Sequence, residues 1–357
     1  MIVPILIFVN IRSLRINSKA IIMPRCRPAA GVLLPRPRFI IIPAMDRKTQ
    51  FREAFLEKIG NSPSENVPLS ALSSFGIGGP ADLFFEARTE EELEKAVALA
   101  VGEKYPFYVI GGGNNVLFDD AGYRGLLLRN RLEGIVREEG RIRVLSGTGL
   151  PAILREALSA GLSGLEFLAG IPGTVGGAVY GNAGAYGWSI GDVLETATLL
   201  CPGGERQPMT REALRFGYRD SALKHGGGGI VLDAVLSCSP GDIQTSEAKI
   251  HDILEKRRTK HPPLGTACAG SYFKNSCSAT GERIMAGQLL EQAGARGLAV
   301  GDAAVYEKHC NFIINKGNAG SRDVLLLAEE LKERVYRKFG VRLEEEVIHL
   351  RADASGQ

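Results

Sequence analysis

Glycine is the residue type that most constrains this fold, because 44 of the 357 residues are glycine and many of them gather in runs. Proteins average roughly 7% glycine, so the chain is enriched. Runs lie at residues 111–113 and 226–229, and a longer glycine-rich segment covers 170–187. They have no fixed period, which excludes a collagen-like helix. Glycine permits tight turns and close approach of backbone to a ligand, so these runs predict a turn-rich, ligand-binding fold.

The composition is typical of a folded soluble protein with two or three domains. Hydrophobic residues make up 45% of the chain and charged residues 23%, which excludes disorder as the main state. The net charge of +3 is local, because residues 1–45 hold seven basic residues and no acidic one. The remainder holds 36 basic and 40 acidic residues, so we expect no nucleic-acid partner.

The cysteines and histidines show neither disulfide nor metal spacing. The six cysteines are Cys26, Cys201, Cys238, Cys268, Cys277 and Cys310, and no two of them form a C-x-x-C pair. We therefore expect reduced thiols, a cytoplasmic location and no metal site.

Residues 1–45 differ from the sequence that follows. Their apolar run at 2–9 precedes Arg12 and Arg15, whereas a signal peptide has its charges first, and the run is too short to span a membrane. We expect a leader outside the fold and no membrane partner. The leader is either translated upstream sequence, with Met45 as the native start, or a real but disordered tail. An amphipathic helix is predicted after Met45, and its apolar face is expected to contain Phe51, Phe55, Leu56 and Ile59.

The body opens with a predicted strand, helix, strand and glycine loop. The strands are 83–86 and 107–110, and the helix at 89–101 has a capping box formed by Thr89 and Glu92. Its apolar stripe is expected to contain Leu93, Val97, Ala100 and Val101. Further strands are predicted at 125–128, 193–200, 229–237, 312–314 and 341–350, a hairpin at 134–145, and helices at 151–160, 242–260, 285–293 and 321–339, the last capped by Ser321.

A first glycine motif, at residues 76–81, matches the dinucleotide pattern G-x-G-x-x-A. That motif should follow a strand and open a helix, but here it precedes a strand. A Rossmann site is therefore not favoured. Kinase and serine-hydrolase functions have no support either, because the chain has no Walker loop and no nucleophile elbow.

Two other glycine segments are candidates for a phosphate-bearing ligand. Residues 111–115 follow a predicted strand and expose backbone N–H groups, to which Asn114 and Asn115 add amide donors. Alone, this loop is equally compatible with a structural turn. Residues 170–187 are almost uncharged, which suits backbone around a flat ring system and its pyrophosphate. The alternative for that segment is a buried crossover loop.

Three charged or hydroxyl-bearing segments follow, each with an ordinary structural explanation. Arg219 stands near Tyr218 and could simply pair with Asp220. In residues 270–275, an extended backbone places Ser271, Phe273 and Asn275 on one face and Tyr272 and Lys274 on the other. In a strand at 344–346, Glu344 and Glu346 share a face, which is either exposed or functional.

Taken together and in order, these motifs resemble the UDP-N-acetylenolpyruvoylglucosamine reductase family. The resemblance runs from about residue 66 to about residue 350 and includes residues 74–81, 111–117, 171–187, 218–221, 270–275 and 343–347. The segments 186–237 and 307–309 look like the shorter type II subclass, which lacks an extra tyrosine-bearing loop. The sequence departs from the family pattern at Gly76, Ser276 and Cys310.

The resemblance implies an α+β fold with a two-part FAD-binding region of the vanillyl-alcohol-oxidase type (VAO/PCMH), followed by a smaller α+β substrate-binding domain. The expected boundaries are 46–117 and 118–240 for the two FAD-binding parts, 241–350 for the substrate-binding domain and 351–357 for a tail. FAD is expected to bind non-covalently. The implied cofactor contacts are Ile110, Gly111, Gly112, Gly113, Asn114, Asn115, Val116, Gly173, Thr174, Gly176, Gly177, Asn182 and Ala183.

The implied reaction reduces UDP-N-acetylglucosamine enolpyruvate to UDP-N-acetylmuramate, a peptidoglycan precursor. NADPH is the co-substrate, and the hydride passes through flavin N5. The resemblance assigns Arg219 to polarise the substrate carboxylate, Ser271 to donate the proton and Glu346 to complete the enol-stabilising set. Lys274 and Arg219 are candidates to stabilise the serine alkoxide. Weaker expectations for UDP-sugar contacts are Tyr186, Lys274, Asn275 and His309, and the chain is expected to be a monomer.

Two alternatives stay open at this point. One is another flavin oxidoreductase built on the same FAD-binding parts, which has no need for Arg219, Ser271 and Glu346 together. The other is a flavin-binding or sugar-nucleotide-binding module that has lost catalysis, against which the presence of all three residue types argues.

Overall fold

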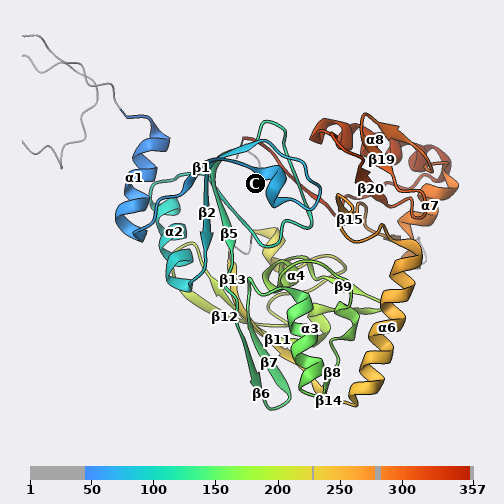
Figure 1. The fold of residues 1–357 in the computed structure, drawn as a ribbon, viewed down its shortest axis with the longest axis horizontal. Coiled ribbons are helices and arrows are strands. Elements are labelled where there is room, and N and C mark those ends of the chain that lie inside the picture. The colour runs from blue at the N-terminus through green and yellow to red at the C-terminus, as the bar shows by residue number, and fades with distance from the viewer. Residues whose placement is uncertain (1–44, 227–228, 278–282, 354–357) are drawn as a thin grey trace, which may run out of the picture. The chain divides into compact units, whose positions relative to one another are not determined.

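A mixed four-stranded sheet covered by two helices forms the first part of the fold (Figure 1). The computed structural model describes residues 45–226, 229–277 and 283–353. The leader hypothesis for residues 1–44, the centre of the 226–229 loop and the end of the tail lie outside them. The sheet order is β1-β2-β5-β3, with β1 antiparallel to β2 and with β2 and β3 parallel to β5. The elements are α1 (Arg47–Ile59), β1 (Ser64–Pro68), a 3-10 turn (Leu69–Leu72), β2 (Pro80–Ala87), α2 (Glu90–Gly102), β3 (Phe107–Ile110) and β5 (Tyr123–Asn130).

The predicted helix and strand at the start of this part are confirmed. In α1 and α2, however, the buried face is narrower than predicted. The capping box of Thr89 and Glu92 is present, and β3 has its predicted bounds. Leu56 and Val101, however, are exposed. Each directly follows a buried residue. Successive side chains of an α-helix lie about 100° apart around the axis, so the side chain after the buried one points away from the sheet.

The first sheet extends beyond residue 117, where the sequence analysis ends the first part. β5 pairs with β2 on one side and β3 on the other, so the first sheet extends through Asn130. The parallel sheet needs this central strand, because β2 and β3 make no ladder with each other.

An antiparallel five-stranded sheet forms the second part, in the order β12-β11-β13-β7-β6. Its strands are β6 (Ile135–Glu138), β7 (Arg141–Leu145), β11 (Leu194–Leu200), β12 (Arg206–Thr210) and β13 (Ile230–Ser237), and the predicted hairpin of β6 and β7 is confirmed. Connecting elements are α3 (Leu150–Ser159), β8 (Leu162–Ser163), a 3-10 turn (Glu166–Leu168), α4 (Val175–Gly181), β9 (Gly184–Ala185), β10 (Trp188–Ser189), α5 (Ile190–Val193), a second 3-10 turn (Ala222–His225) and β14 (Ser239–Pro240).

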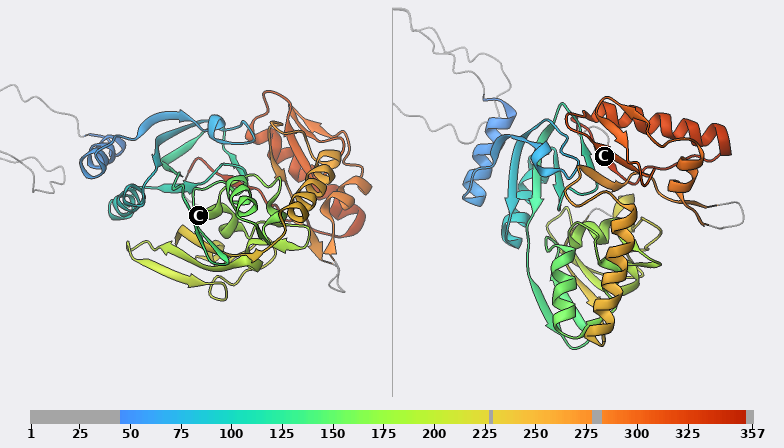
Figure 2. Two further views of the ribbon diagram at one scale, coloured as in Figure 1. Left: turned by 60° about the horizontal axis from the view of Figure 1, so that its bottom comes forward. Right: turned by 45° about the vertical axis from the view of Figure 1, so that its right-hand side comes forward.

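The long helix α6 (Ile243–Lys260) follows the predicted boundary at residue 240, yet it packs against elements of the second part. Figures 1 and 2 show α6 beside α3. The Ser246 hydroxyl on α6 donates a 2.7 Å hydrogen bond to the buried Glu166 carboxylate. The smaller C-terminal domain therefore begins after Lys260.

The C-terminal domain has a sheet in the order β15-β20-β19-β18 and a core that includes Ile313, Leu327 and Leu331. Its elements are β15 (Cys268–Ser271), β16 (Ser276–Cys277), β17 (Arg283–Ile284), α7 (Ala286–Gln292), β18 (Ala299–Val300), β19 (Ala303–Val305), β20 (Phe312–Asn315) and α8 (Ser321–Phe339). Ser321 is the first residue of α8 and not its cap, which is Gly320. Instead, Asp120 of the first part accepts from the Ser321 N–H at 2.8 Å.

Of the strand predicted at 341–350, only β21 (Ile348–Leu350) is present, paired in parallel with β4 (Val116–Phe118). Before β21, the chain pairs with a different neighbour: the Lys274 N–H donates to Glu344 O and the Glu346 N–H donates to Tyr272 O, both at 2.8 Å. The two ends of this segment therefore have different partners, and no strand is assigned at residues 346–347 between them.

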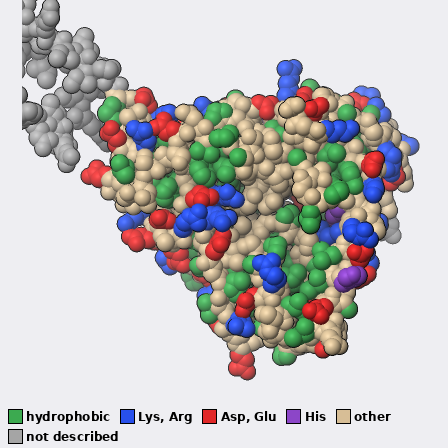
Figure 3. Space-filling model, viewed as in Figure 1, with side chains coloured by type: hydrophobic (Ala, Val, Ile, Leu, Met, Phe, Trp, Pro, Cys, Tyr) green, Lys and Arg blue, Asp and Glu red, His purple; other side chains and the backbone are tan. Residues whose placement is uncertain are grey.

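Positive and negative side chains intermix on the face drawn in Figure 3. Among the described residues, none of the helices is both long and apolar enough to cross a membrane. Cys201, Cys238, Cys268 and Cys310 are free thiols. Cys26 and the Cys277 side chain lie outside what the structure describes.

Phe55→Ala and Leu56→Ala form a matched test of how α1 packs. Phe55 is fully buried against the Phe51 and Phe85 rings, so its truncation should lower the free energy of unfolding by about 3–5 kcal/mol. The same change at exposed Leu56 should stay within about 0.5 kcal/mol. Denaturant unfolding measures both, and equal effects would contradict this packing.

Candidate active site

The two glycine segments singled out in the sequence lie against each other. A Cβ at Gly111 would lie 2.2 Å from Thr174 Oγ1, and one at Gly112 would lie 3.5 Å from Gly173 Cα. Gly113 has φ +67° and faces Leu72 O so closely that no side chain fits. The loop after β3 and the loop before α4 therefore form one cradle of side-chain-free backbone.

The structure gathers most of the predicted cofactor residues at this cradle. Residues 110–116 and 173–177 form its two sides. Asn182 and Ala183 lie beyond the far end of α4. The Asn182 side chain is only 6% exposed, and protein groups occupy both of its ends.

Arg219 lies in a tight turn that spans residues 217–220. It has φ +56°, a left-handed conformation that non-glycine residues rarely adopt. Its Nη2 donates to Gly184 O at 2.7 Å, and its Nε lies 2.8 Å from Glu346 Oε1. The simpler pairing of Arg219 with Asp220 is absent, because Asp220 pairs with His225 at 2.7 Å.

Glu346 is the acidic partner that the C-terminal domain brings to this turn. Burial raises the pKa of its carboxyl, and the positive charges of Arg219, Lys224 and Lys274 oppose that rise. Its backbone oxygen accepts from Asn115 Nδ2 at 3.0 Å. The acid is thus joined by its backbone to the glycine cradle and by its side chain to Arg219.

Ser271 lies in the segment next to Glu346 and belongs to β15. It is half-buried at the end of that strand and is followed by Tyr272, whose carbonyl accepts from the Glu346 N–H. The predicted trio therefore comes from three segments that are far apart in the sequence. Tyr272 and Phe273, which the sequence places on opposite faces, are both buried.

Lys224 is a site residue that the sequence analysis missed. Its Nζ donates to Arg219 O at 2.7 Å and lies 5.6 Å from the centre of the Tyr180 ring. Burial lowers the pKa of Lys224, and the nearby charge of Lys274 lowers it further. No sequence signal marked it, because the contact depends on the 3-10 turn that follows Ser221.

Arg257 on α6 is a second missed cation. Its guanidinium lies 5.8 Å from the centre of the Tyr186 ring, and burial lowers its pKa. Its Nε is buried without a hydrogen-bond partner in the described part of the chain. A Cβ at Gly170 would lie 2.8 Å from Arg257 Cδ, so this arginine packs against the start of the second glycine segment.

The predicted substrate contacts divide into two groups. Tyr186 is exposed at the turn between β9 and β10, and Lys274 is half-buried beside Glu344, with which it pairs. Asn275 and His309 have partners inside the C-terminal domain. Asn275 Oδ1 accepts from the Ala286 N–H at 3.0 Å, and His309 Nδ1 accepts from the Asn311 N–H at 3.2 Å.

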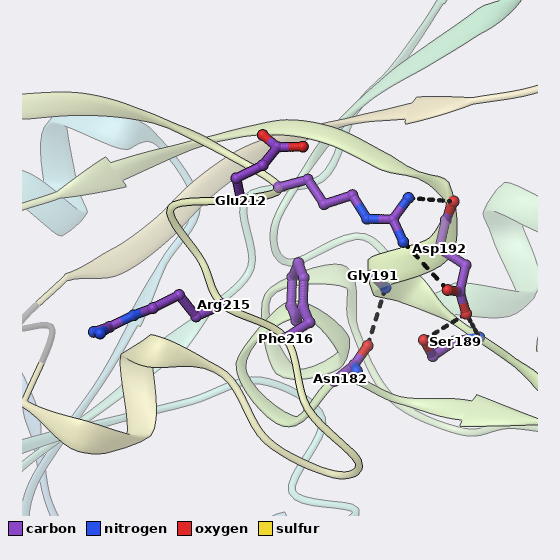
Figure 4. A pocket seen from close by; sticks show the side chains of 8 residues that line it. Asn182, Ser189, Gly191, Asp192, Glu212, Arg215 and Phe216 are labelled. Atoms are coloured by element: carbon purple, nitrogen blue, oxygen red, sulfur yellow. Dashed lines mark hydrogen bonds and ion pairs between the residues drawn. The ribbon is translucent and has the colours of Figure 1, made fainter.

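A cavity of about 290 Å³ lies on another side of the arginine turn (Figure 4). Phe216, Asn182 and Gly191 line one part of it, and the ion pair of Asp192 and Arg211 lines another. Neither the glycine cradle nor the carboxyl of Glu346 contributes to it. We therefore place the candidate active site at the cradle and the ion pair.

Two protein-family models match the chain. The family model described as "FAD binding domain" matches residues 81–209. The model described as "UDP-N-acetylenolpyruvoylglucosamine reductase, C-terminal domain" matches residues 262–350. The second match begins just after α6. The fold is thus an α+β fold with a two-part FAD-binding region and a smaller C-terminal domain.

Similar proteins share one name. A UDP-N-acetylenolpyruvoylglucosamine reductase of Clostridium tetani is 37% identical over 314 residues, which cover 87% of this chain and 99% of that protein. UDP-N-acetylenolpyruvoylglucosamine reductase 2 of Symbiobacterium thermophilum is 41% identical over 282 residues, 78% of this chain and 89% of that one. The crystal structure of the Thermus caldophilus reductase matches with a TM-score of 0.65 at 34% identity, covering 79% of this chain and 97% of that chain.

The titration of Glu346 tests the electrostatics of this site. Because burial raises the pKa of Glu346, its carboxyl should keep its proton at pH values above 4.5, the ordinary pKa of a glutamate carboxyl. Arg219→Gln should raise the pKa further, since it removes a cation that favours the ionised form. The folded protein then holds a proton that the unfolded chain has lost, so this carboxyl lowers stability as the pH rises through that interval.

Carboxyl NMR on wild type and Arg219→Gln measures this titration. The matched control is Arg137→Gln, which removes an exposed arginine paired with Glu156 at 3.0 Å and should leave Glu346 unchanged. A Glu346 pKa at or below the ordinary value, or one insensitive to Arg219→Gln, would refute this description of the site.

Proposed function

The chain belongs to the UDP-N-acetylenolpyruvoylglucosamine reductase family, FAD-dependent oxidoreductases of peptidoglycan synthesis that use NADPH, and from this premise we propose how its residues carry the reaction. The substrate is UDP-N-acetylglucosamine enolpyruvate and the product is UDP-N-acetylmuramate. The observation that carries the proposal is the pairing of Arg219 with Glu346 beside the Ser271 segment, at the edge of the glycine cradle.

The cradle has the chemistry that a bound FAD requires. A Cβ would collide with Thr174 Oγ1 of the other loop at Gly111, with Asn114 Oδ1 at Gly112 and with Leu72 O at Gly113, so glycine keeps this backbone bare. Backbone N–H groups there can hold a pyrophosphate, and half-buried Arg257 has a buried Nε that finds no hydrogen-bond partner in the described residues. We assign the cradle and Arg257 to FAD, bound without a covalent link.

Bound at the cradle, FAD would supply the hydride-transfer chemistry that links NADPH, through flavin N5, to the vinyl terminus of the substrate. The task left to the protein is to hold the carboxylate, to stabilise the negative charge that develops beside it and to deliver one proton. We assign the first task to Arg219. Its guanidinium has five donors, and the contacts to Gly184, Asn182 and Glu346 engage only part of that set.

Ser271 is the proposed proton donor, and Glu346 completes the stabilisation of the enolate. A serine hydroxyl is a weak acid in water, so it can donate only if nearby cations stabilise its alkoxide. Lys274 was the cation expected from the sequence, and Lys224 joins it because the two lysines lie close enough to influence each other. Burial favours the protonated form of the Glu346 carboxyl, and only that form can donate a hydrogen bond to a developing enolate.

The assembled trio favours this reaction over another flavin oxidoreductase or an inactive binding module. Neither alternative requires an arginine in a left-handed turn to meet an acid from another domain. All three residues come from one chain, so we propose that the enzyme works as a monomer. NADPH and the UDP-sugar are intracellular metabolites, so we propose a cytoplasmic location.

Ser271→Ala separates the two half-reactions. Turnover with the enolpyruvyl sugar nucleotide should fall at least about 100-fold, because a positioned acid is lost. Reduction of the flavin by NADPH, followed anaerobically by its absorbance, should keep the wild-type rate. The control Ser239→Ala, at an exposed serine of β14, should retain both steps. Loss of both half-reactions in Ser271→Ala would refute the assigned role.

A further inference from the structure

The Asn182 side chain was expected to contact the cofactor, yet the structure shows it joining two protein segments. Its Nδ2 donates to Gly217 O at 2.6 Å, and its Oδ1 accepts from the Gly191 N–H at 3.0 Å. Figure 4 shows the second of these bonds beside the Phe216 ring. A Cβ at Gly191 would lie 2.7 Å from that ring and 3.0 Å from Asn182 Oδ1, so glycine is required there.

Gly217, which receives the first bond, is the first residue of the turn that carries Arg219. The turn is closed by the Gly217 N–H donating to Asp220 O at 3.0 Å and the Asp220 N–H donating to Gly217 O at 3.2 Å. Arg219 adopts φ +56° within it, a left-handed conformation that is unfavourable for a residue with a Cβ. Contacts from outside the turn must therefore hold it in place.

Asn182 contacts both the backbone of the turn and the guanidinium of Arg219. Its side chain holds the turn, and its backbone oxygen accepts from Arg219 Nη1 at 3.4 Å. Asn182 itself has φ +47° at the end of α4, a conformation that asparagine tolerates better than most residues. With 6% of its surface exposed, it has little access to a ligand.

We infer that Asn182 is a positioning residue, which fixes the turn of Arg219 so that the guanidinium meets both Glu346 and the substrate. This inference rests on the proposed role of Arg219 in reduction of the enolpyruvyl group. It removes the Asn182 side chain from the set of FAD contacts. A change at Asn182 should then affect the half-reaction that uses Arg219 and spare the one that does not.

Asn182→Gly tests this inference, because glycine keeps the left-handed backbone and loses both side-chain hydrogen bonds. In the FAD-loaded enzyme, flavin reduction by NADPH should stay within about threefold of wild type. Reoxidation by the enolpyruvyl sugar nucleotide should slow at least tenfold. Calorimetry should also show weaker binding of that nucleotide to the oxidised enzyme. The matched control is Asn66→Gly, another left-handed asparagine (φ +53°), exposed in β1, which should change none of these.

Asn182→Asp is the second variant, and it isolates the Gly217 bond. Aspartate can still accept from the Gly191 N–H but cannot donate to Gly217 O, so reoxidation should again slow. It keeps the test decisive if the glycine variant does not fold. Equal slowing of both half-reactions, or wild-type reoxidation in Asn182→Asp, would overturn the inference.

A double-mutant cycle shows whether Asn182 acts through Arg219. In an Arg219→Ala background, Asn182→Gly should slow reoxidation no further, because the group that it positions is gone. Additive losses would contradict the positioning role. If Arg219→Ala alone leaves reoxidation at the wild-type rate, the proposed function of Arg219 fails. If Arg219→Ala is slow but both Asn182 variants match wild type, only the inference fails.

Discussion

The ion pair between Arg219 and Glu346 is the interaction on which the rest of the site depends. It joins a turn of the second FAD-binding part to the C-terminal segment, with both side chains about four-fifths buried. Removing two charges from water is costly, and their mutual attraction repays that cost only where further hydrogen bonds satisfy the groups. Here Gly184 O and Asn182 O accept from the guanidinium, while Lys224 and Lys274 add positive charge near the acid.

The backbone fixes the distances between the groups that the reaction needs. Ser74 links the glycine loop to the C-terminal domain, since its hydroxyl donates to Cys268 O at 2.8 Å and its N–H donates to Gly113 O at 3.1 Å. Asn115 links the same loop to Glu346. Asp120 binds the start of α8. The cradle, the Ser271 strand and the acid therefore belong to one hydrogen-bonded framework, so side-chain flexibility contributes little to their spacing.

Local signals in the sequence predicted most helices and strands. They could not predict contacts between segments that are distant in the sequence. The Thr89 capping box, the hairpin of β6 and β7 and the strand β3 depend on neighbouring residues, and all are confirmed. Residues 341–350 read as one strand because their alternation cannot reveal that the partner changes at Ile348. The motifs named Arg219, Ser271 and Glu346, but not Lys224, Arg257 or the turn-holding contacts of Asn182, which arise only when loops meet.

The most direct test of this account follows the flavin absorbance of the wild-type enzyme through one complete cycle without oxygen. NADPH is added first and the enolpyruvyl sugar nucleotide second. The account predicts that the yellow colour bleaches with NADPH and returns with the nucleotide, because one site carries out both half-reactions. A flavin that bleaches but recovers only when oxygen is admitted would contradict the assignment of the substrate and of the residues that act on it.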